Sequence, residues 1–416
     1  MIRFIHTADI HFGMENYGRI DPQTGIHSRL LDFKQSFDTC VDYAIEQSVD
    51  LFVFAGDAYK TANPSPTQQK LLMQSFMRLY RARIPVVIVV GNHDNPLSYG
   101  KANALDIFAH LPVDGFYVFS KPESMTIQTK SGAVQIVGIP WPNRHNVAIN
   151  FTHFAQSATE LTKHISDSLA TIITKLAQDL NPEVPAILVG HLTVSSGIFS
   201  GSEKRAVYGH DPILLPSQLA IKPFDYVALG HLHRFQCVNE GDPIPVVYSG
   251  SIDRIDFGER KEGKGFCDVT IEEKYNTTFI HVPIATRPFI QVDVSLNEQD
   301  DQTEQILKAL GKHTISDAIL KITYEIPTTL TDMVDVKKIQ KYCFDAMHIV
   351  GIIPIRSIQT RAHRDLLRNE MNLETLLQTY FESQDSLKKR ATVLTEKALR
   401  LDELQEACDG TSHEEI

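Results

Sequence analysis

The chain has 416 residues, too many for one compact core, so two or three domains are expected. A hydrophobic fraction of 43% and a charged fraction of 22% are ordinary for a globular protein and exclude a low-complexity or fibrous chain. The net charge of -11 disfavours broad, non-specific binding to nucleic acid, although acidic side chains that hold cations account for part of it.

The N-terminal sequence and the cysteines indicate the cellular compartment in which the protein is expected. The N-terminal sequence MIRFIHTADIHFG lacks the long apolar run of a signal peptide. No stretch approaches the ~18 uncharged apolar residues that a membrane helix needs, so a cytoplasmic protein with no membrane contact is expected. The cysteines are scattered and never spaced as CxxC, which argues against a disulfide framework and a thiolate zinc site. They are Cys40, Cys237, Cys267, Cys343 and Cys408.

From residue 1 to about residue 250, short apolar runs alternate with longer segments of helical periodicity. The apolar runs predict strands at residues 2–6, 51–55, 86–90, 186–189, 226–229, 246–248, 266–271 and 277–282. The periodic segments predict amphipathic helices at residues 28–47, 65–83 and 157–180. Strands that alternate with helices predict an α/β fold built on a layered sheet of mixed strand direction.

Residues 283–288 are predicted to be a boundary, because a second and shorter alternation follows them. Strands are predicted at residues 289–294, 319–326 and 350–358, and helices at residues 301–310 and 335–347. This pattern predicts a small α+β domain. From residue 372, two apolar stripes predict a helical tail with little core of its own. The stripes consist of Leu373, Leu376, Leu377, Tyr380 and Phe381, and of Leu387, Ala391, Leu394, Ala398 and Leu401.

Polar motifs directly follow five of the predicted strands. They are Asp9-Ile10-His11, Gly56-Asp57, Gly91-Asn92-His93-Asp94, Gly190-His191 and Gly230-His231-Leu232-His233. Because ligand sites in α/β sheets lie outside the carboxyl ends of the strands, these motifs are expected to meet at one edge. The glycines within them allow sharp turns and close backbone approach.

The donor types in these motifs indicate a metal centre. The candidate ligands are Asp9, His11, Asp57, Asn92, His191, His231 and His233. Carboxylate, amide and imidazole donors suit manganese, iron or zinc, and the absence of thiolate disfavours a structural zinc site. Two divalent ions ~3.5–4 Å apart can clamp a phosphate and deliver a hydroxide in line with the leaving oxygen. Asp57 is expected to bridge them, because its two oxygens can serve two ions.

Each motif by itself is a weak signal. A lone Asp-x-His or Gly-His-x-His sequence usually belongs to a surface or a helix cap. The Gly-Asn-His-Asp motif is sharper, because three polar side chains in a row against a core need a partner. The combination of all motifs on successive strand ends favours the metal centre. The other histidines, among them His6 and His110, lack this setting and are predicted to be structural or solvated.

The DxH, GD, GNHD, GH and GHxH motifs, in this order, resemble the signature of the calcineurin-like metallophosphoesterases. Within that superfamily the chain resembles the SbcD family of bacterial nuclease subunits, through the proline-bearing turn at residues 63–66 and the Tyr-Ser-Gly-Ser segment at residues 248–251. The resemblance implies a layered β-sandwich flanked by helices at residues 1–285. It further implies a small α+β capping domain at residues 286–360 and a helical, partner-binding region at residues 361–416.

The resemblance also implies a role for each site residue. Two groups of three side chains would each hold one metal ion, namely Asp9, His11 and His233, and Asn92, His191 and His231. Asp57 would bridge the two ions, which in this family are typically manganese. His93 would stabilise or protonate the leaving 3′ oxygen rather than bind metal, and Asp94 would orient its ring.

One position departs from the family pattern. Archaeal and eukaryotic relatives carry a second catalytic histidine three residues after the bridging aspartate, where this chain has Lys60. A lysine can contact phosphate as a point charge, but it does not exchange protons near neutral pH as imidazole does. The departure concerns the balance of exonuclease and endonuclease activity and leaves the metal site intact.

Partners are implied by the tail and by basic residues. In the resembled family the C-terminal helices dock on the coiled-coil root of SbcC, an SMC-type ATPase, and a homodimer is expected. The tail could instead fold back on the capping domain, as amphipathic helices usually cover their own core. Basic residues cluster at residues 254–264 and 361–368, where they would contact DNA or remain solvated.

Three functions compete. The leading hypothesis is a manganese-dependent DNA nuclease subunit that cuts ends, hairpins or single strands in DNA repair and recombination. ATP would be used by the partner, because this chain has no GxxxxGK[ST] sequence. A small-molecule phosphodiesterase with the same metals is an alternative, although such enzymes rarely need the extra domain and tail. A non-catalytic scaffold for the ATPase is the third, and the complete donor set disfavours it.

Overall fold

The structure is a computed structural model that describes residues 1–96, 101–142, 157–201, 211–298, 300–327, 330–357, 373–383 and 387–409. Its contacts divide the chain into two compact units. The first unit comprises Met1–Asp293, Ile306–Thr323 and Asp335–Ile352, and the second comprises Val294–Gln305, Tyr324–Val334 and Ile353–Ile416. The predicted division into three domains, with boundaries after residues 285 and 360, stays a prediction.

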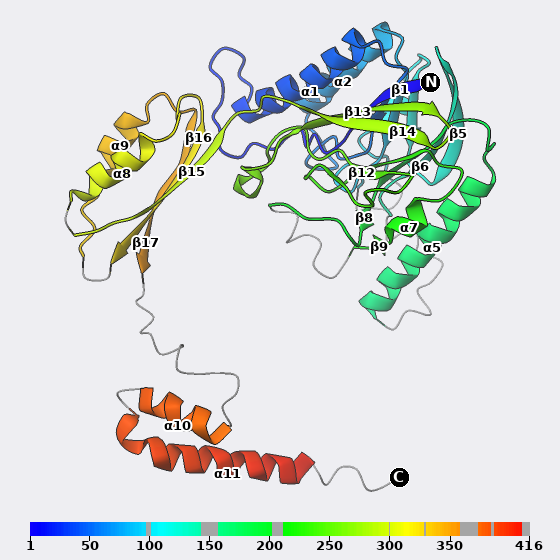
Figure 1. Ribbon diagram of the computed structural model, residues 1–416. Helices are drawn as coiled ribbons and strands as arrows, with labels where there is room; N and C mark the ends of the chain where they lie inside the picture. The colour runs from blue at the N-terminus through cyan, green and yellow to red at the C-terminus, as the bar shows by residue number, and fades with distance from the viewer. Residues whose placement is uncertain are drawn as a thin grey trace. The chain divides into compact units, whose positions relative to one another are not determined.

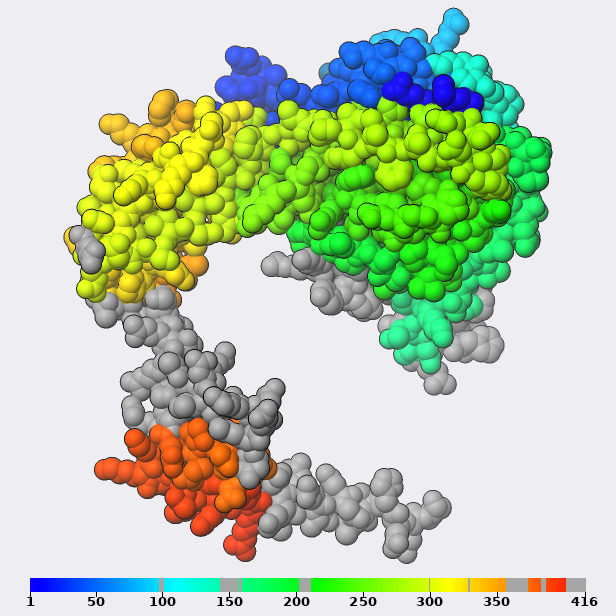
Figure 2. All heavy atoms as spheres, viewed as in Figure 1, coloured from blue at the N-terminus to red at the C-terminus, as the bar shows by residue number. Residues whose placement is uncertain are grey.

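The first large sheet is built around the N-terminal strand. Its strands, in spatial order, are β14 (Asn276–Pro283), β13 (Gly265–Glu273), β1 (Ile2–Thr7), β2 (Leu51–Phe54), β3 (Val86–Val89) and β4 (Phe116–Phe119). Strands β1 to β4 are parallel, and β13 pairs antiparallel with β1, so that Ile2 lies opposite Ile271. The yellow-green atoms of this later segment accordingly adjoin the blue N-terminal atoms (Figure 2).

The second large sheet is also mainly parallel. Its strands, in spatial order, are β11 (Gln236–Cys237), β12 (Val246–Tyr248), β10 (Tyr226–Gly230), β7 (Ala186–His191), β6 (Gly132–Ile139) and β5 (Glu123–Thr129). The two outermost strands, β11 and β5, pair antiparallel with their neighbours, and the inner four are parallel. A short pair, β8 (Thr193–Val194) and β9 (Ile213–Leu214), forms a separate two-stranded sheet that packs into the core of the second sheet.

The two sheets pack face to face, and helices cover their outer faces (Figure 1). Helices α1 (Ser28–Glu46) and α2 (Pro66–Arg81) share a core with the first sheet, to which the single turn α3 (Asp106–Ala109) also contributes. Helix α5 (Ala158–Gln178) and the short α7 (Pro216–Leu219) cover the second sheet. The predicted fold, a layered β-sandwich flanked by helices, is confirmed.

The sequence prediction omitted strands β4, β5 and β6. Strand β5 carries little apolar signal, because Ile127 is its one buried side chain. The residues of β4 are mostly half-buried, and the strand has only four of them. Strand β6 is buried along most of its length, because α5 packs on one of its faces and the first sheet on the other. Pairing with a neighbouring strand, of β4 with β3 and of β5 with the adjacent β6, therefore supports these strands.

A three-stranded sheet follows the sandwich in the sequence. Its strands are β15 (Phe289–Ser295), β16 (Ile319–Pro327) and β17 (His348–Ser357), in that order, and its helices are α8 (Gln302–Leu310) and α9 (Val336–Tyr342). Helix α9 ends earlier than the predicted residue 347. The chain turns there, since the Met347 amide donates to the Ala318 carbonyl at 3.0 Å and leads into β17.

Two helices form the described part of the tail, namely α10 (Leu373–Ser383) and α11 (Ala391–Asp409). They pack on each other (Figure 1), and the Thr395 hydroxyl donates to the Gln378 side chain at 3.1 Å. Part of the predicted stripe faces this contact, but Tyr380 and Leu401 remain 48% and 68% exposed. Among the described residues, no helix combines the length and the apolar character needed to cross a membrane.

Candidate metal centre

The first sheet brings four of the candidate ligands to its carboxyl edge. Asp9 and His11 follow β1, Asp57 follows β2 and Asn92 follows β3. Because these strands are parallel neighbours, their loops leave the sheet at the same end. Asp9 and Asp57 are 0% and 2% exposed, so two carboxylates are buried within one small region.

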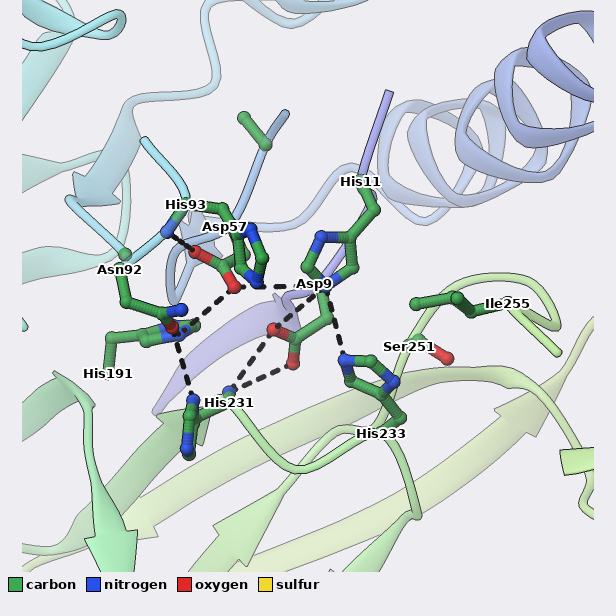
Figure 3. A network of polar contacts seen from close by, with 12 residues as sticks. Asp9, His11, Asp57, Asn92, His93, His191, His231, His233, Ser251 and Ile255 are labelled. Carbon is green, nitrogen blue, oxygen red and sulfur yellow. Dashed lines mark hydrogen bonds and ion pairs between the residues drawn. The ribbon is translucent and has the colours of Figure 1, made fainter. Parts of the chain in front are cut away.

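The second sheet supplies the remaining three candidate ligands. His191 ends β7, and His231 and His233 follow β10, which pairs in parallel with β7. All three imidazoles are buried. The rings of His191 and His233 point toward the carboxylates of the first sheet, whereas the ring of His231 faces Asn92 and its backbone amide donates to Asp9 (Figure 3). The structure therefore brings all seven side chains together where the carboxyl ends of the two sheets meet.

Four of these residues adopt a left-handed backbone, which non-glycine residues rarely use. The φ angles are 53° at Asp9, 52° at His11, 58° at Asp57 and 102° at His231. Each such residue costs about 1–3 kcal/mol and persists only where the surrounding structure determines it. Strain of this kind is typical of sites at which side-chain direction serves a function.

Glycines make room for the ligands, as Gly91 and Gly230 show. A Cβ atom on Gly91 would overlap the backbone nitrogen and a carboxylate oxygen of Asp57. A Cβ atom on Gly230 would overlap the Ala55 carbonyl. Glycine is therefore needed at both positions because the loops of neighbouring strands approach within contact distance.

The first predicted group of ligands, Asp9, His11 and His233, is assembled in the structure. Their ligand atoms all lie within 4.8 Å of one another. The Nε2 atoms of His11 and His233 are 3.1 Å apart, and His11 Nε2 is 3.9 Å from Asp9 Oδ1. Two imidazole nitrogens at this distance both face the same small space, an arrangement that suits a shared cation.

The second predicted group, Asn92, His191 and His231, meets at the amide oxygen of asparagine. Asn92 Oδ1 lies 2.9 Å from His191 Nε2 and 3.2 Å from His231 Nδ1. Amide oxygen and imidazole are again donors that divalent transition metals accept. The group thus offers a second pocket of donors beside the first.

Asp57 lies between the two groups, as predicted for a bridging residue. Its Oδ2 atom is 3.7 Å from His11 Nε2 and 3.4 Å from His191 Nε2. Its other oxygen, Oδ1, accepts a hydrogen bond from the His93 amide at 2.8 Å. That its two oxygens serve two ions stays a prediction. One oxygen faces both groups, because the backbone of the Gly-Asn-His-Asp turn occupies the other.

In two histidines, Nδ1 is hydrogen-bonded to a protein acceptor, which leaves Nε2 to bind a cation. His191 Nδ1 lies 2.8 Å from the Ala55 carbonyl, and His233 Nδ1 lies 2.9 Å from the Glu259 carboxylate. A carbonyl and a carboxylate only accept, so each Nδ1 carries a proton and each Nε2 is the atom left to bind a cation. The donors present therefore fit two divalent cations.

The electrostatics of the cluster also favour positive charge. Burial by itself lowers the pKa of His191, but the carboxylates of Asp57 and Asp9 more than offset this and raise it to about 9. Burial by itself would raise the pKa of Asp57, whereas the charges of His191 and His93 bring it well below its usual range. The buried carboxylates thus stabilise a cation among them.

Asp94 has a different position from the one predicted. The expected contact was with the His93 ring, but the Asp94 carboxylate accepts backbone N–H bonds from Asp57, Ala58, Tyr59 and Gly91 at 2.9–3.3 Å. It therefore clamps the loop after β2 to the loop after β3 and holds Asp57 in place.

His93 is the exposed member of the cluster. Its Nδ1 lies 2.8 Å from the Lys60 carbonyl, so the backbone of Lys60 orients the ring in place of Asp94. The ring stands 5.0 Å from the His11 ring, centre to centre, and nearly perpendicular to it. His93 therefore lies at the exposed edge of the site, with a ligand atom within 4.8 Å of those of His11 and Asp57.

Sequence reasoning missed three residues that contact the candidate ligands. Glu259 bonds to His233, Asp211 lies 3.5 Å from His231 Nε2, and the Trp141 ring stands 4.7 Å from the His231 ring. Trp141 follows β6, so the strand-end rule would have found it had that strand been predicted. Glu259 and Asp211 follow no strand of the two large sheets, and no motif singled them out.

Some of the basic residues at 254–264, which were expected to contact DNA or remain solvated, are buried or partly buried in the protein. Lys264 is 2% exposed and pairs with Glu259 at 2.8 Å. Arg254 bonds to the Glu262 carbonyl at 2.9 Å and to Thr286. Neither side chain is a solvated surface charge, because burial requires each to be paired. The cluster at 361–368 lies outside the described residues.

The sandwich and its cluster of carboxylate, amide and imidazole donors together define a metal-dependent phosphoester hydrolase. The chain belongs to the calcineurin-like phosphoesterase family, whose family model matches residues 2–235. This match spans all seven candidate ligands. Members of this family bind two divalent metal ions, as the two groups of donors require.

Individual relatives extend the comparison. The chain is 26% identical over 347 residues to the SbcD subunit of the nuclease SbcCD from Staphylococcus epidermidis, a match that covers 79% of this chain and 84% of that protein. Among solved structures, a dimetal phosphatase from Danio rerio has 11% identity and a TM-score of 0.39, covering 67% of this chain and 98% of that one. A purple acid phosphatase from yellow lupin has 11% identity and a TM-score of 0.38, covering 67% and 51%.

Proposed function

We propose that the chain is a manganese-dependent DNA nuclease subunit that hydrolyses phosphodiester bonds at ends and hairpins. The likeness to the staphylococcal nuclease subunit carries this proposal. That likeness covers 79% of the chain, whereas the family match ends at residue 235, little more than halfway along. It therefore continues beyond the catalytic sandwich, into parts that a small-molecule phosphodiesterase rarely needs.

A cavity of about 450 Å³ beside the site supports a polymeric substrate. It is lined by Thr61, Ala62, Asn63, Asn92, His93, Asn95, Pro96 and Lys101. Beside apolar atoms, its lining carries the amides of Asn63, Asn92 and Asn95, the Thr61 hydroxyl and the Lys101 ammonium, and it has no aromatic side chain other than His93. Amides and a lysine suit the phosphates and sugars of a strand. One such strand could run past His93 with its scissile phosphate at the metal centre.

The chain's own residues have distinct tasks in the proposed reaction. When bound, the two ions would neutralise the phosphate charge and activate the attacking water. The water oxygen bonds to phosphorus and gives up a proton to solvent while the bond from phosphorus to the 3′ oxygen breaks. As an imidazolium, His93 donates its Nε2 proton to that leaving oxygen and keeps the Nδ1–H that the Lys60 carbonyl accepts. The products carry a 5′-phosphate and a 3′-hydroxyl.

The substrate class is tested by offering two phosphodiesters to the purified chain with manganese. A labelled hairpin DNA and a nitrophenyl phosphodiester are compared under the same conditions. We expect cleavage of the hairpin, with a 5′-phosphate on the product. Turnover of the nitrophenyl ester without cleavage of any DNA would instead favour a small-molecule phosphodiesterase.

The role of His93 is tested by His93→Leu. Removal of a positioned general acid typically costs about 10²–10⁴-fold in rate. We expect a loss of this size in DNA cleavage, whereas manganese binding, measured by calorimetric titration, stays at two ions. Wild-type cleavage by His93→Leu would show that another group protonates the leaving oxygen.

We further propose that the C-terminal region, residues 361–416, binds an SbcC-like ATPase of the SMC type. The apolar side chains that α10 and α11 leave exposed support this, because such a surface favours a helical partner. Deletion of residues 372–416 should abolish co-purification with the ATPase and leave manganese binding unchanged. An intact complex with the truncated chain would contradict the proposal. A homodimer is expected as well, and light scattering of the isolated chain tests it.

A further inference from the structure

Glu259 is buried directly behind the candidate metal centre. It ends the short 3-10 helix η1 (Phe257–Glu259) and is 0% exposed. Its carboxylate Oε1 lies 2.9 Å from His233 Nδ1, on the side of the ring opposite the donor cluster. A buried carboxylate of this kind requires several partners, and its contacts indicate what it does.

The other carboxylate oxygen of Glu259 is surrounded by donors. Oε2 lies 2.8 Å from Lys264 Nζ, 3.0 Å from the Ile255 amide and 3.5 Å from the Ser251 hydroxyl. Lys264 Nζ also donates to the backbone carbonyl of His233 at 2.9 Å. The Glu259–Lys264 pair therefore holds His233 by both its ring and its backbone.

We propose that Glu259 is a positioning residue of the metal centre. Its Oε1 holds the proton of His233 on Nδ1, so that Nε2 presents its lone pair to the ion of the group formed by Asp9, His11 and His233. Carboxylates behind metal-binding histidines commonly set the tautomer and the orientation of the ring in this way. The inference rests on the metal centre and is independent of the choice of DNA as substrate.

The donors around Oε2 make Glu259→Gln an informative substitution. Lysine and a backbone amide at that position can only donate, so they select the carbonyl oxygen of glutamine. The NH₂ group of the glutamine then faces His233 Nδ1, which must accept. The proton of the imidazole moves to Nε2, the atom that faces the metal. The variant therefore keeps the shape of the side chain but reverses the tautomer.

Asp225 provides a matched control for burial and ion pairing. It is 0% exposed, pairs with Lys274 at 2.8 Å and accepts from the Ala186 amide at 2.8 Å. It precedes β10, whereas His231 and His233 follow that strand. Asp225→Asn thus disturbs a comparable buried carboxylate–lysine pair at the opposite end of the strand from the donors.

The test is a calorimetric titration of the metal-free, full-length chain with Mn²⁺, resolved into two sites. Loss of such a supporting carboxylate typically costs about 10–100-fold in metal affinity. Glu259→Gln should weaken one of the two sites by this factor and leave the other within about threefold of wild type. Asp225→Asn should lower the melting temperature without changing either affinity. Two wild-type affinities in Glu259→Gln, or an equal loss in Asp225→Asn, would overturn the inference.

A measurement on the wild-type chain covers the case in which Glu259→Gln does not fold. Nitrogen-15 spectra of the metal-free protein report the tautomer of each histidine, and His233 is assigned from the signal lost in His233→Gln. We expect a proton on Nδ1 and none on Nε2. The opposite tautomer would overturn the inference. Neither measurement uses DNA. A failed nuclease assay would therefore contradict the proposed function, whereas a failed metal titration would contradict the role of Glu259.

Discussion

At the scale of single residues, the candidate centre depends on backbone conformations that the amino acids themselves disfavour. Asp9, His11, Asp57 and His231 all have positive φ. The cost of about 1–3 kcal/mol for each is offset by contacts such as those of Asp94, whose carboxylate gathers four backbone amides. Small changes in backbone spacing should therefore damage the site.

Gly91→Ala tests this dependence. The added methyl group would overlap Asp57 and push it from its place between the two groups of donors. We expect a loss of about 1–3 kcal/mol in the free energy of unfolding of the metal-free chain, measured by urea titration, and a clear loss of manganese affinity. Gly263→Ala is the control, because a Cβ atom there meets nothing within 4 Å. Equal behaviour of the two variants would refute the spacing argument.

His6 makes a second prediction at this scale, away from the metal. It is fully buried between Tyr226 and the Leu229 carbonyl, and burial lowers its pKa to about 3. Since the unfolded chain binds this proton near pH 6.5 and the folded chain does not, stability should fall as the pH drops below about 6.5. The contribution of His6 to the slope is at most about 1.4 kcal/mol per pH unit and continues toward pH 3.

The measurement is urea unfolding at pH 7, 6 and 5 in the presence of a chelator. His6→Asn should be less stable at pH 7 and should show a shallower dependence on pH than the wild type. His110→Asn, at an exposed position, should keep the wild-type dependence. An unchanged slope in His6→Asn would mean that His6 takes up a proton in the folded state.

At the scale of elements, a partly buried ion pair that no sequence motif revealed links the segment before β15 to α1. Arg287 precedes β15 and contacts Asp32 of α1 through two bonds, at 2.8 Å from Nε and 2.7 Å from Nη2. Arg29 shares the same carboxylate at 2.8 Å, and Arg287 also pairs with Asp317. Bidentate arginine–carboxylate pairs give fixed geometry as well as energy.

Arg287→Met should therefore weaken the connection between α1 and β15. We expect a loss of about 1–3 kcal/mol in unfolding free energy by urea titration, less than for a fully buried pair because Arg29 still neutralises Asp32. Lys121→Met is the control, since Lys121 is 75% exposed and its pair with Glu123 contributes little. Similar losses in both variants would show that the Arg287–Asp32 pair stabilises the fold no more than an exposed pair does.

At the scale of the whole molecule, the candidate centre lies where the two sheets of the sandwich meet. The first sheet contributes Asp9 and Asp57, among others, and the second contributes His191 and His231. Without cations, buried carboxylates and imidazoles face one another across this junction. Bound ions would satisfy donors from both sheets at once and so stabilise the packing of one sheet on the other.

Manganese should accordingly raise the stability of the folded chain. At a free ion concentration 100 times the dissociation constant, each site adds about 2.7 kcal/mol to the free energy of unfolding. We expect a higher melting temperature with manganese in scanning calorimetry and a return to the metal-free value with excess chelator. Asp57→Asn, which removes charge shared by both groups, should show a smaller increase. An increase equal to that of the wild type would place Asp57 outside the centre.

The sequence by itself determined the α/β class and the side chains that meet at the site. Apolar runs in the sequence predict buried strands, and neighbouring parallel strands have their carboxyl ends at the same edge of the sheet. Polar motifs such as Gly56-Asp57 and Gly230-His231, placed directly after such runs, therefore reveal a common site before any coordinates are known. The donor types then indicate a metal site, because carboxylate, amide and imidazole side chains are rarely buried together unless they bind a common partner.

Only the tertiary structure decided which atom of each side chain faces which partner. It showed that one oxygen of Asp57 faces both groups, that Asp94 clamps backbone amides, and that Glu259 and Lys264 stand behind His233. Such contacts depend on distances of a few ångströms between segments far apart in the chain, and no local pattern records them. The alternation of residues along a strand predicts which face of the sheet a side chain lies on. Its hydrogen-bond partners depend on how the two sheets pack.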